Sequence, residues 1–146
     1  MMGSIEKRRY SHGKCRLDQV DELQEQSEAG ATVVNSNGAE GCDACYGHHA
    51  DWVDYTGEIK RKIIGVAIFD HPSNFRRSFY HVRNYGLFTV SPFGESAYTA
   101  DTSKRDAAPV VLERGESLTL RYAMFVHNGD AEEAQVASRY SGYAAS

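Results

Sequence analysis

Hydrophobic and polar residues alternate along this chain from residue 31 onward, and the alternation predicts β-strands. Residues 62–70 (KIIGVAIFD) form a nearly continuous apolar run of strand length, which indicates a strand covered on both faces. Residues 116–130 (ESLTLRYAMFVHNGD) contain the clearest strand, which ends at the tight-turn pair Asn128-Gly129. One face of that strand is predicted to carry Leu118, Leu120, Tyr122, Met124 and Val126.

Three shorter segments are also predicted to be strands. Residues 31–38 (ATVVNSNG) end in a turn signal, NSNG. Residues 49–57 (HADWVDYTG) alternate Trp52, Asp54 and Thr56 with Val53 and Tyr55, and they are expected to turn at Thr56-Gly57. Residues 81–90 (HVRNYGLFTV) are predicted to form one strand, in which Gly86 marks a bulge or a close backbone approach.

The pattern divides the chain into three parts. Residues 1–29 are strongly polar, and the helical spacing of Leu17, Val20 and Leu23 supports at most a short surface helix. Residues 30–131 carry the strand pattern, and residues 132–146 are a polar C-terminal tail compatible with a short helix. The predicted fold class is all-β: a mainly antiparallel β-sandwich with short peripheral helices.

Charge and hydropathy exclude several classes of partner. The 146 residues carry a formal charge of −4, and the basic runs at residues 60–62 and 76–77 are too short to form a basic face, so no nucleic acid is expected. The longest apolar run falls far short of the roughly 20 residues of a spanning helix. The first residues lack the apolar core of a secretory signal, so a soluble, cytoplasmic protein with no membrane partner is expected.

The three cysteines leave the metal question open. Cys42 and Cys45 have C-x-x-C spacing, and His48 and His49 follow them, which is a pattern able to supply zinc ligands. No second ligand pair follows further along, which favours reduced, incidental thiols. His71, His81 and His127 could together bind a transition metal, although their spacing does not show that they converge. Metal and cofactor content therefore stay unknown at this point.

Residues 70–88 (DHPSNFRRSFYHVRNYGLF) hold the densest candidate chemistry. A continuous strand would project His81, Arg83 and Tyr85 from one face, where they could bind a polyhydroxylated or carboxylated molecule. His71 follows a buried strand and precedes Pro72, which restricts its backbone. The alternatives are a solvated strand face for the first set and a simple turn for residues 70–74. His127, at the end of a strand, is similarly either a turn residue or a ligand.

Six segments of the chain resemble, in order, a family of uncharacterised bacterial proteins often labelled "methane oxygenase PmoA family", a domain of unknown function (DUF6807-like). They are VVNSNG, ADWVDYTG, GVAIFDHPSN, HVRNYGLF, SPFG and GESLTLRYAMFVHNGDA, between residues 33 and 131. The resemblance implies a supersandwich or jelly-roll-like β-sandwich and association with carbohydrates. Carried over motif by motif, it points to Asn35, Asp54, His71, Asn74, His81, Arg83, Tyr85 and His127.

The chain departs from that family in two respects. Tyr80 and Asn84 flank the HVR motif where the family usually has tryptophan and aspartate. Family members are also about twice as long, so the resemblance covers only their C-terminal half. A partial sandwich leaves apolar faces and strand edges uncovered, which favours homo-oligomers, aggregation or a missing partner segment, and the chain is a candidate truncated gene product.

The expected ligand is therefore a saccharide or a related oxygen-rich small molecule. As an enzyme, the protein would use His71 and His81 as general acid and base, with Arg83 holding the substrate and Tyr85 donating to an oxyanion. Asp54 or Asp70 could orient a histidine. The alternatives are a non-catalytic carbohydrate-binding module, with Asn35, Asp54, Asn74 and His127 as binding residues, and an inactive fragment. Methane oxidation is not expected, because the subunit that the label evokes is an integral membrane protein.

Overall fold

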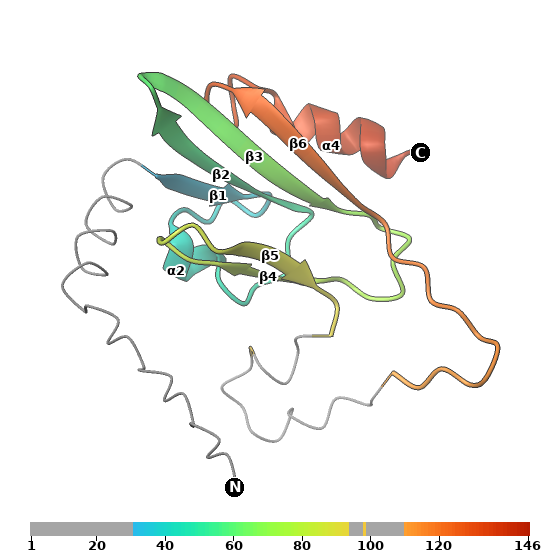
Figure 1. The fold of residues 1–146 in the computed structure, drawn as a ribbon. Helices are drawn as coiled ribbons and strands as arrows, with labels where there is room; N and C mark the ends of the chain where they lie inside the picture. Colours follow the sequence, from blue (N-terminus) through green and yellow to red (C-terminus); the bar gives the residue numbers. More distant parts are fainter. Residues whose placement is uncertain (1–30, 94–97, 99–109) are drawn as a thin grey trace, which may run out of the picture.

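The computed structural model describes residues 31–93, Tyr98 and residues 110–146 (Figure 1). Every paired strand is antiparallel, and the strands form two sheets. The larger sheet has the order β1-β2-β3-β6, and the smaller is the hairpin β4-β5. The elements are β1 (Thr32–Asn35), α2 (Cys42–Cys45), β2 (Trp52–Ile59), β3 (Lys62–Asp70), β4 (Phe79–Val82), β5 (Phe88–Ser91), β6 (Tyr122–Asn128) and α4 (Val136–Ala144).

Two hydrophobic clusters hold these layers together. One face of the large sheet contributes Val53 and Ile68, which pack with Tyr80 and Val82 of β4 and with Cys45 of α2. The opposite face contributes Ala67 and Phe69, which pack against Val136 of α4. The all-β, sandwich-like fold class is thereby confirmed, with short helices at the periphery (Figure 1).

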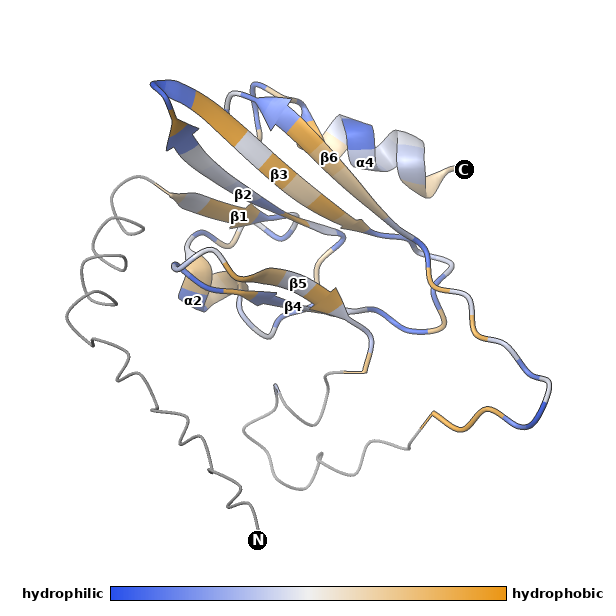
Figure 2. Cartoon of the chain, viewed as in Figure 1, coloured by the Kyte–Doolittle hydropathy of each residue, from blue (hydrophilic) through white to orange (hydrophobic). Residues whose placement is uncertain are grey.

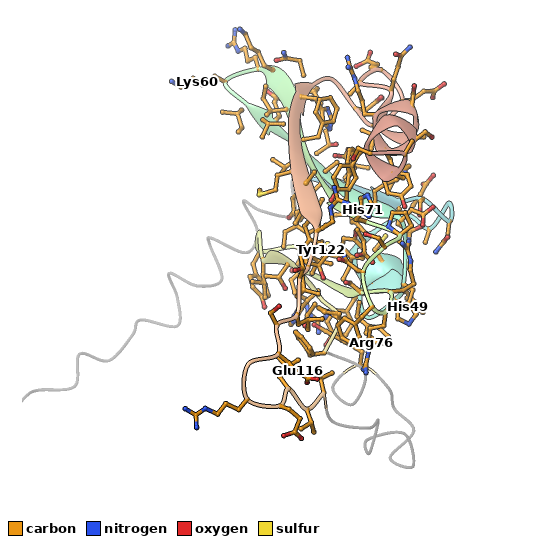
Figure 3. All side chains as sticks on the ribbon, turned by 90° about the vertical axis from the view of Figure 1, so that its right-hand side faces the viewer. His49, Lys60, His71, Arg76, Glu116 and Tyr122 are labelled. Carbon is orange, nitrogen blue, oxygen red and sulfur yellow. The ribbon has the colours of Figure 1, made fainter. Side chains whose placement is uncertain are left out.

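The buried strand predicted at residues 62–70 is confirmed, but the turn before it is not at Thr56-Gly57. β2 continues to Ile59, which pairs with Lys62, and the two-residue turn between them is Lys60-Arg61. Both turn residues have positive φ angles, 52° and 62°, as a tight hairpin requires. The basic run at residues 60–62 is therefore exposed at a strand end, and Lys60 projects from the hairpin tip in Figure 3.

The continuous strand predicted at residues 81–90 is wrong. β4 ends at Val82, and the chain turns before β5 begins at Phe88. The backbone N–H of Arg83 donates to Leu87 O at 2.9 Å, and Gly86 adopts a φ of 88°, which favours glycine. The segment is therefore a hairpin, and Arg83 and Tyr85 lie in its turn.

The last strand is shorter than predicted, and its face with Met124 and Val126 is exposed. Leu118 and Leu120 lie outside β6. Met124 and Val126 are 71% and 64% exposed, whereas Phe125 packs toward α4 on the other face. Figure 2 shows the apolar stretches of β3 and β6 side by side. Met124 and Val126, which belong to this apolar surface, are in neither of the two hydrophobic clusters.

The structure describes the C-terminal end of the chain but not residues 1–30. The helix considered for residues 1–29 lies outside the described residues. The polar segment at 132–146 does contain a helix, α4, and its Val136 is fully buried against the sheet. No helix within the described part of the chain is long and apolar enough to cross a membrane.

Candidate functional site

The residues predicted to form a site lie in separate places. His81 and Arg83 share the outer side of the β4-β5 hairpin, and Tyr85 projects from its turn with 55% exposure. His71 and Asn74 lie in the loop after β3. Asp54 and His127 meet on the α4 side of the large sheet, and Asn35 ends β1. The structure thus separates the predicted set into four groups.

The outer side of β4 carries a group of rings around one cation, called here the aromatic–arginine cluster: Tyr46, His81, Arg83 and Tyr98. The Arg83 guanidinium carbon lies 3.6 Å from the centroid of the Tyr46 ring. The His81 ring meets Tyr46 edge-on at 4.9 Å and Tyr98 at 5.8 Å, and Tyr46 and Tyr98 are 5.4 Å apart. His81 and Arg83 are therefore brought together through Tyr46, and not by a shared strand face, because only His81 is on a strand.

Tyr55 of β2 holds the turn that carries Arg83. Its hydroxyl lies 3.3 Å from Arg83 O and 3.0 Å from Asn84 O, so it donates to the turn that carries the guanidinium. Burial is the main cause that raises the pKa of Tyr55, which keeps this hydroxyl protonated and able to donate. The turn is thereby anchored to the large sheet.

A depression of about 400 Å³ opens beside Arg83, and it combines hydrogen-bond acceptors with a donor. Glu40 and Asp43 provide carboxylates, and Arg83 provides a planar set of N–H donors. No carboxylate among the described residues forms an ion pair with Arg83. The lining residues are Glu40, Gly41, Cys42, Asp43, Ala44, Arg83 and Asn84.

His71 and Asn74 belong to a buried network that joins β3 to β6. The Asn74 amide donates to Asp70 Oδ1 at 2.7 Å and to Arg121 O at 2.9 Å, and its oxygen accepts from Arg121 N at 2.7 Å. The other carboxylate oxygen of Asp70 accepts from Ser78 N at 2.8 Å. A local turn bond is present, from Asn74 N to His71 O, but the side chains of Asp70 and Asn74 do more than close a simple turn: they pin the start of β6 to the end of β3.

The His71 side chain is enclosed within this network. His71 is 4% exposed, its Nδ1 accepts from Ser73 N at 3.1 Å, and its ring meets Tyr143 edge-on at 5.1 Å. Its Nε2 is buried without a hydrogen-bond partner among the described residues. Figure 3 shows His71 near Tyr122, at the start of β6. In this position the imidazole faces protein atoms and not the depression beside Arg83.

Asp54 and His127 form a buried pair. Their side chains are 0% and 3% exposed, and His127 Nε2 lies 2.8 Å from Asp54 Oδ1. The Thr56 hydroxyl donates to the other carboxylate oxygen at 2.8 Å, and the imidazole stacks on Phe125. Asp54 therefore does orient a histidine, but the histidine is His127.

Asn35 has a local role. Its side-chain oxygen accepts the N–H groups of Asn37 at 2.9 Å and Ala39 at 3.0 Å, which closes the turn after β1.

The cysteines and histidines do not gather around a common point. Within the described residues, no group of three or more His, Cys, Asp or Glu side chains could hold a metal ion. Cys42 and Cys45 are free thiols, and Cys15 lies outside the described part. Burial raises the pKa of Cys45 to about 11 and also raises that of Cys42, so neither thiol is activated as a nucleophile or ligand.

Sequence reasoning missed Tyr46, Tyr98 and the acidic lining of the depression. Tyr46 directly follows the C-x-x-C motif, but nothing in its spacing from His81 or Arg83 indicates contact. Tyr55 was predicted only to lie on one face of a strand. Tyr46 meets His81 and Arg83 because α2 packs on β4, although Cys42–Cys45 and Phe79–Val82 are far apart in sequence.

Fold and site together define a small, mainly antiparallel β domain with a polar surface depression beside the aromatic–arginine cluster. Residues 4–141 match a family described as "Family of unknown function (DUF6807)", and the chain belongs to that family. The match extends beyond residues 33–131, where the sequence motifs lie, at both ends. No curated protein and no solved structure matches the chain.

Proposed function

We propose that this chain recognises a carbohydrate or a related oxygen-rich small molecule at the aromatic–arginine cluster and the depression beside it. One observation carries the proposal. The Arg83 guanidinium is stacked on Tyr46 at 3.6 Å and borders the depression, without a carboxylate partner among the described residues. Stacking fixes the plane of the guanidinium and leaves its N–H edges available to a ligand.

The mixed polarity of the depression supports a hydroxyl-rich ligand. Each sugar hydroxyl both donates and accepts a hydrogen bond, so it requires acceptors and donors at short range. Glu40 and Asp43 supply acceptors, while Arg83 supplies donors. The rings of Tyr46 and Tyr98 lie in the cluster and not in the lining of the depression, so they would offer aromatic surface to the carbon face of a sugar that extends past Arg83 onto the cluster.

The burial of His71 and His127, the other two candidate histidines, favours recognition over catalysis. His71 and His127 are enclosed by protein atoms, so neither can serve as a proton donor to a molecule in the depression. His81 is the half-buried imidazole within the cluster. It is the residue to which acid–base chemistry would fall if the protein were an enzyme, which is the second candidate function.

The resemblance to carbohydrate-associated bacterial proteins supports the same ligand class. The six shared segments occur in one order along the chain, and we propose that they correspond to the C-terminal half of such proteins. In that view the recognition site belongs to this half alone, because every residue of the cluster lies between Tyr46 and Tyr98.

A binding screen with matched variants tests the proposal. Monosaccharides and uronic acids are screened by thermal shift, and hits are titrated by calorimetry against wild type, Arg83→Ala and Arg76→Ala. Arg76 is the matched control, since its guanidinium also stacks on an aromatic ring, Phe75 at 4.7 Å, but does not line this depression.

Arg83→Ala is expected to weaken binding about tenfold or more, the effect of losing charge-assisted hydrogen bonds of about 1.5–3 kcal/mol. Arg76→Ala is expected to leave it unchanged. Absence of binding across the panel, or equal loss in both variants, would overturn the proposal. Turnover of a bound sugar that His81→Gln abolishes would favour the enzyme candidate.

A further inference from the structure

Strand β6 has one edge that no described strand covers. It stands at the end of the strand order and, among the described strands, pairs only with β3. The backbone N–H of Gly129 donates to Ile63 O, and Arg121 O accepts from His71 N. Because hydrogen-bonding direction alternates along an antiparallel strand, residues 121, 123, 125, 127 and 129 face β3. The N–H and C=O groups of Tyr122, Met124, Val126 and Asn128 therefore point away from the sheet.

This edge lacks the features that usually prevent strands from pairing. The sequence YAMFVHN has no lysine, no other charged residue apart from a titratable histidine, no proline and no glycine. Its register with β3 runs without a bulge from residue 122 to residue 128. Natural edge strands are commonly protected by charges, proline or bulges. An unprotected edge of seven residues is a pairing surface.

We propose that two copies of this chain pair through β6 in antiparallel orientation, about a two-fold axis at Phe125, to form a continuous eight-stranded sheet. This register alone matches all four outward-facing residues with outward-facing residues. Tyr122 pairs with Asn128 of the second copy, and Met124 pairs with Val126 of the second copy. A shift of one residue would oppose outward-facing groups to inward-facing ones, and a shift of two would leave residues unpaired.

The side chains of this register are also complementary. Met124 and Val126, 71% and 64% exposed in the single chain, come directly opposite one another and cover apolar surface. The two Phe125 rings face each other across the axis on the α4 side. At each end of the paired strands, Arg121 of one copy lies opposite residue 129 of the other copy, next to Asp130. Both Arg121 and Asp130 are exposed. No like charges oppose each other along β6.

Self-association is favoured over pairing with a different protein because the edge complements itself. Its apolar pair, its two polar ends and its hydrogen-bonding groups all meet suitable partners under a single two-fold axis. Figure 3, in which β6 faces the viewer, shows α4 beside the strand and no described strand in front of it. The inference is independent of the proposed sugar site, which lies on the β4-β5 hairpin.

Two double variants with the same number of introduced charges test the register. Met124→Lys with Val126→Lys opposes lysine to lysine across the axis, whereas Met124→Glu with Val126→Lys opposes glutamate to lysine. Sedimentation velocity over a concentration series measures the dimer Kd. The wild type is expected to form a dimer and nothing larger. The lysine–lysine variant is expected to raise Kd about tenfold or more, and the glutamate–lysine variant to retain the dimer.

Amide hydrogen exchange of the wild type supplies a test that needs no mutation. In the dimer, the amides of Tyr122, Met124, Val126 and Asn128 are expected to be protected as strongly as those that face β3. They are expected to exchange rapidly in the lysine–lysine variant, while the amides facing β3 stay protected. Circular dichroism melts establish that both variants are folded.

Several outcomes would overturn the inference. A wild type that stays monomeric at high concentration would do so, as would assemblies larger than a dimer, because the two-fold axis closes the interface. Equal dissociation of both variants would refute the register. Retention of the dimer by the lysine–lysine variant would place the interface elsewhere.

Discussion

A substitution at Gly65 of β3 tests the buried Asp54–His127 pair most directly. The His127 ring lies against the backbone of Gly65, so that a Cβ added there would lie 2.5 Å from Nε2 and 3.0 Å from Nδ1. Real Cβ atoms do not approach this closely, and the strand is paired on both sides by β2 and β6. In Gly65→Ala the imidazole must therefore move, and its hydrogen bond to Asp54 at 2.8 Å is lost.

The expected cost follows from the groups involved. A hydrogen bond to a charged group contributes about 1.5–3 kcal/mol, and buried polar groups left unsatisfied add about 1–3 kcal/mol. Replacing glycine by alanine in a strand returns roughly 0.5–1 kcal/mol of backbone entropy. Asp54 keeps the Thr56 hydroxyl as a partner. We therefore expect Gly65→Ala to lower the free energy of unfolding by about 2–5 kcal/mol.

Urea denaturation with a matched glycine measures this effect. Gly57→Ala is the control, because Gly57 also lies in the large sheet and a Cβ there would meet nothing within 4 Å. That variant is expected to be within about 1 kcal/mol of wild type. In a His127→Ala background the clash is absent, so Gly65→Ala should be neutral or stabilising by up to about 1 kcal/mol.

Two results would refute this reasoning. If Gly65→Ala costs no more than Gly57→Ala, His127 is not held against the strand as described. If its full cost persists in the His127→Ala background, the cost comes from the strand backbone and not from the imidazole.

Two further predictions concern the polar groups buried between the layers. Burial, followed by the nearby Asp70 carboxylate, raises the pKa of Tyr80, whose hydroxyl donates to Ile68 O at 2.9 Å. Above pH 10 the unfolded chain releases this proton while the folded chain keeps it, so stability falls as pH rises. In urea titrations from pH 8 to 11, the stability curves of wild type and Tyr80→Phe should run parallel up to about pH 9, and by pH 11 wild type should have lost about 1.4 kcal/mol more than the variant; curves that stay parallel over the whole range would contradict the assignment. Asn74→Asp replaces the amide that donates to Asp70 by a second carboxylate, and thermal or urea unfolding at pH 7 should show a loss of about 2–4 kcal/mol. Asn37→Asp, in the exposed turn after β1, is the matched control and should cost less than about 1 kcal/mol; equal losses would mean that Asn74 does not join β3 to β6.

The strand pattern was predictable where period and turn chemistry agreed. The apolar run of β3 and the β1 strand before NSNG follow directly from the letters. The hairpin of β4 and β5 was missed because HVRNYGLFTV alternates acceptably as one strand. The turn depends on Gly86 at positive φ and on Tyr55 binding the turn carbonyls from another strand. Propensity along one segment contains no information on that second contact.

The candidate site was predictable in part for a similar reason. The density of His, Arg and aromatic residues at 70–88 drew attention to His81 and Arg83, which both contact the Tyr46 ring. It also drew in His71 and Tyr85, which the fold places in a buried network and at an exposed turn tip. Local density cannot distinguish these environments, because burial is decided by which segments pack above each residue.

The sequence by itself determined that this protein is a small antiparallel β domain, since alternation, turn residues and a modest net charge are local properties of the chain. Only the tertiary structure decided which polar residues meet: Asp54 with His127 across the large sheet, and Tyr46 with Arg83 where α2 packs on β4. It also decided that Met124 and Val126 are exposed on β6, at an edge that no strand in the described part of the chain covers. Long-range pairing brings together residues that are far apart in sequence, and no periodicity within one segment specifies its partner.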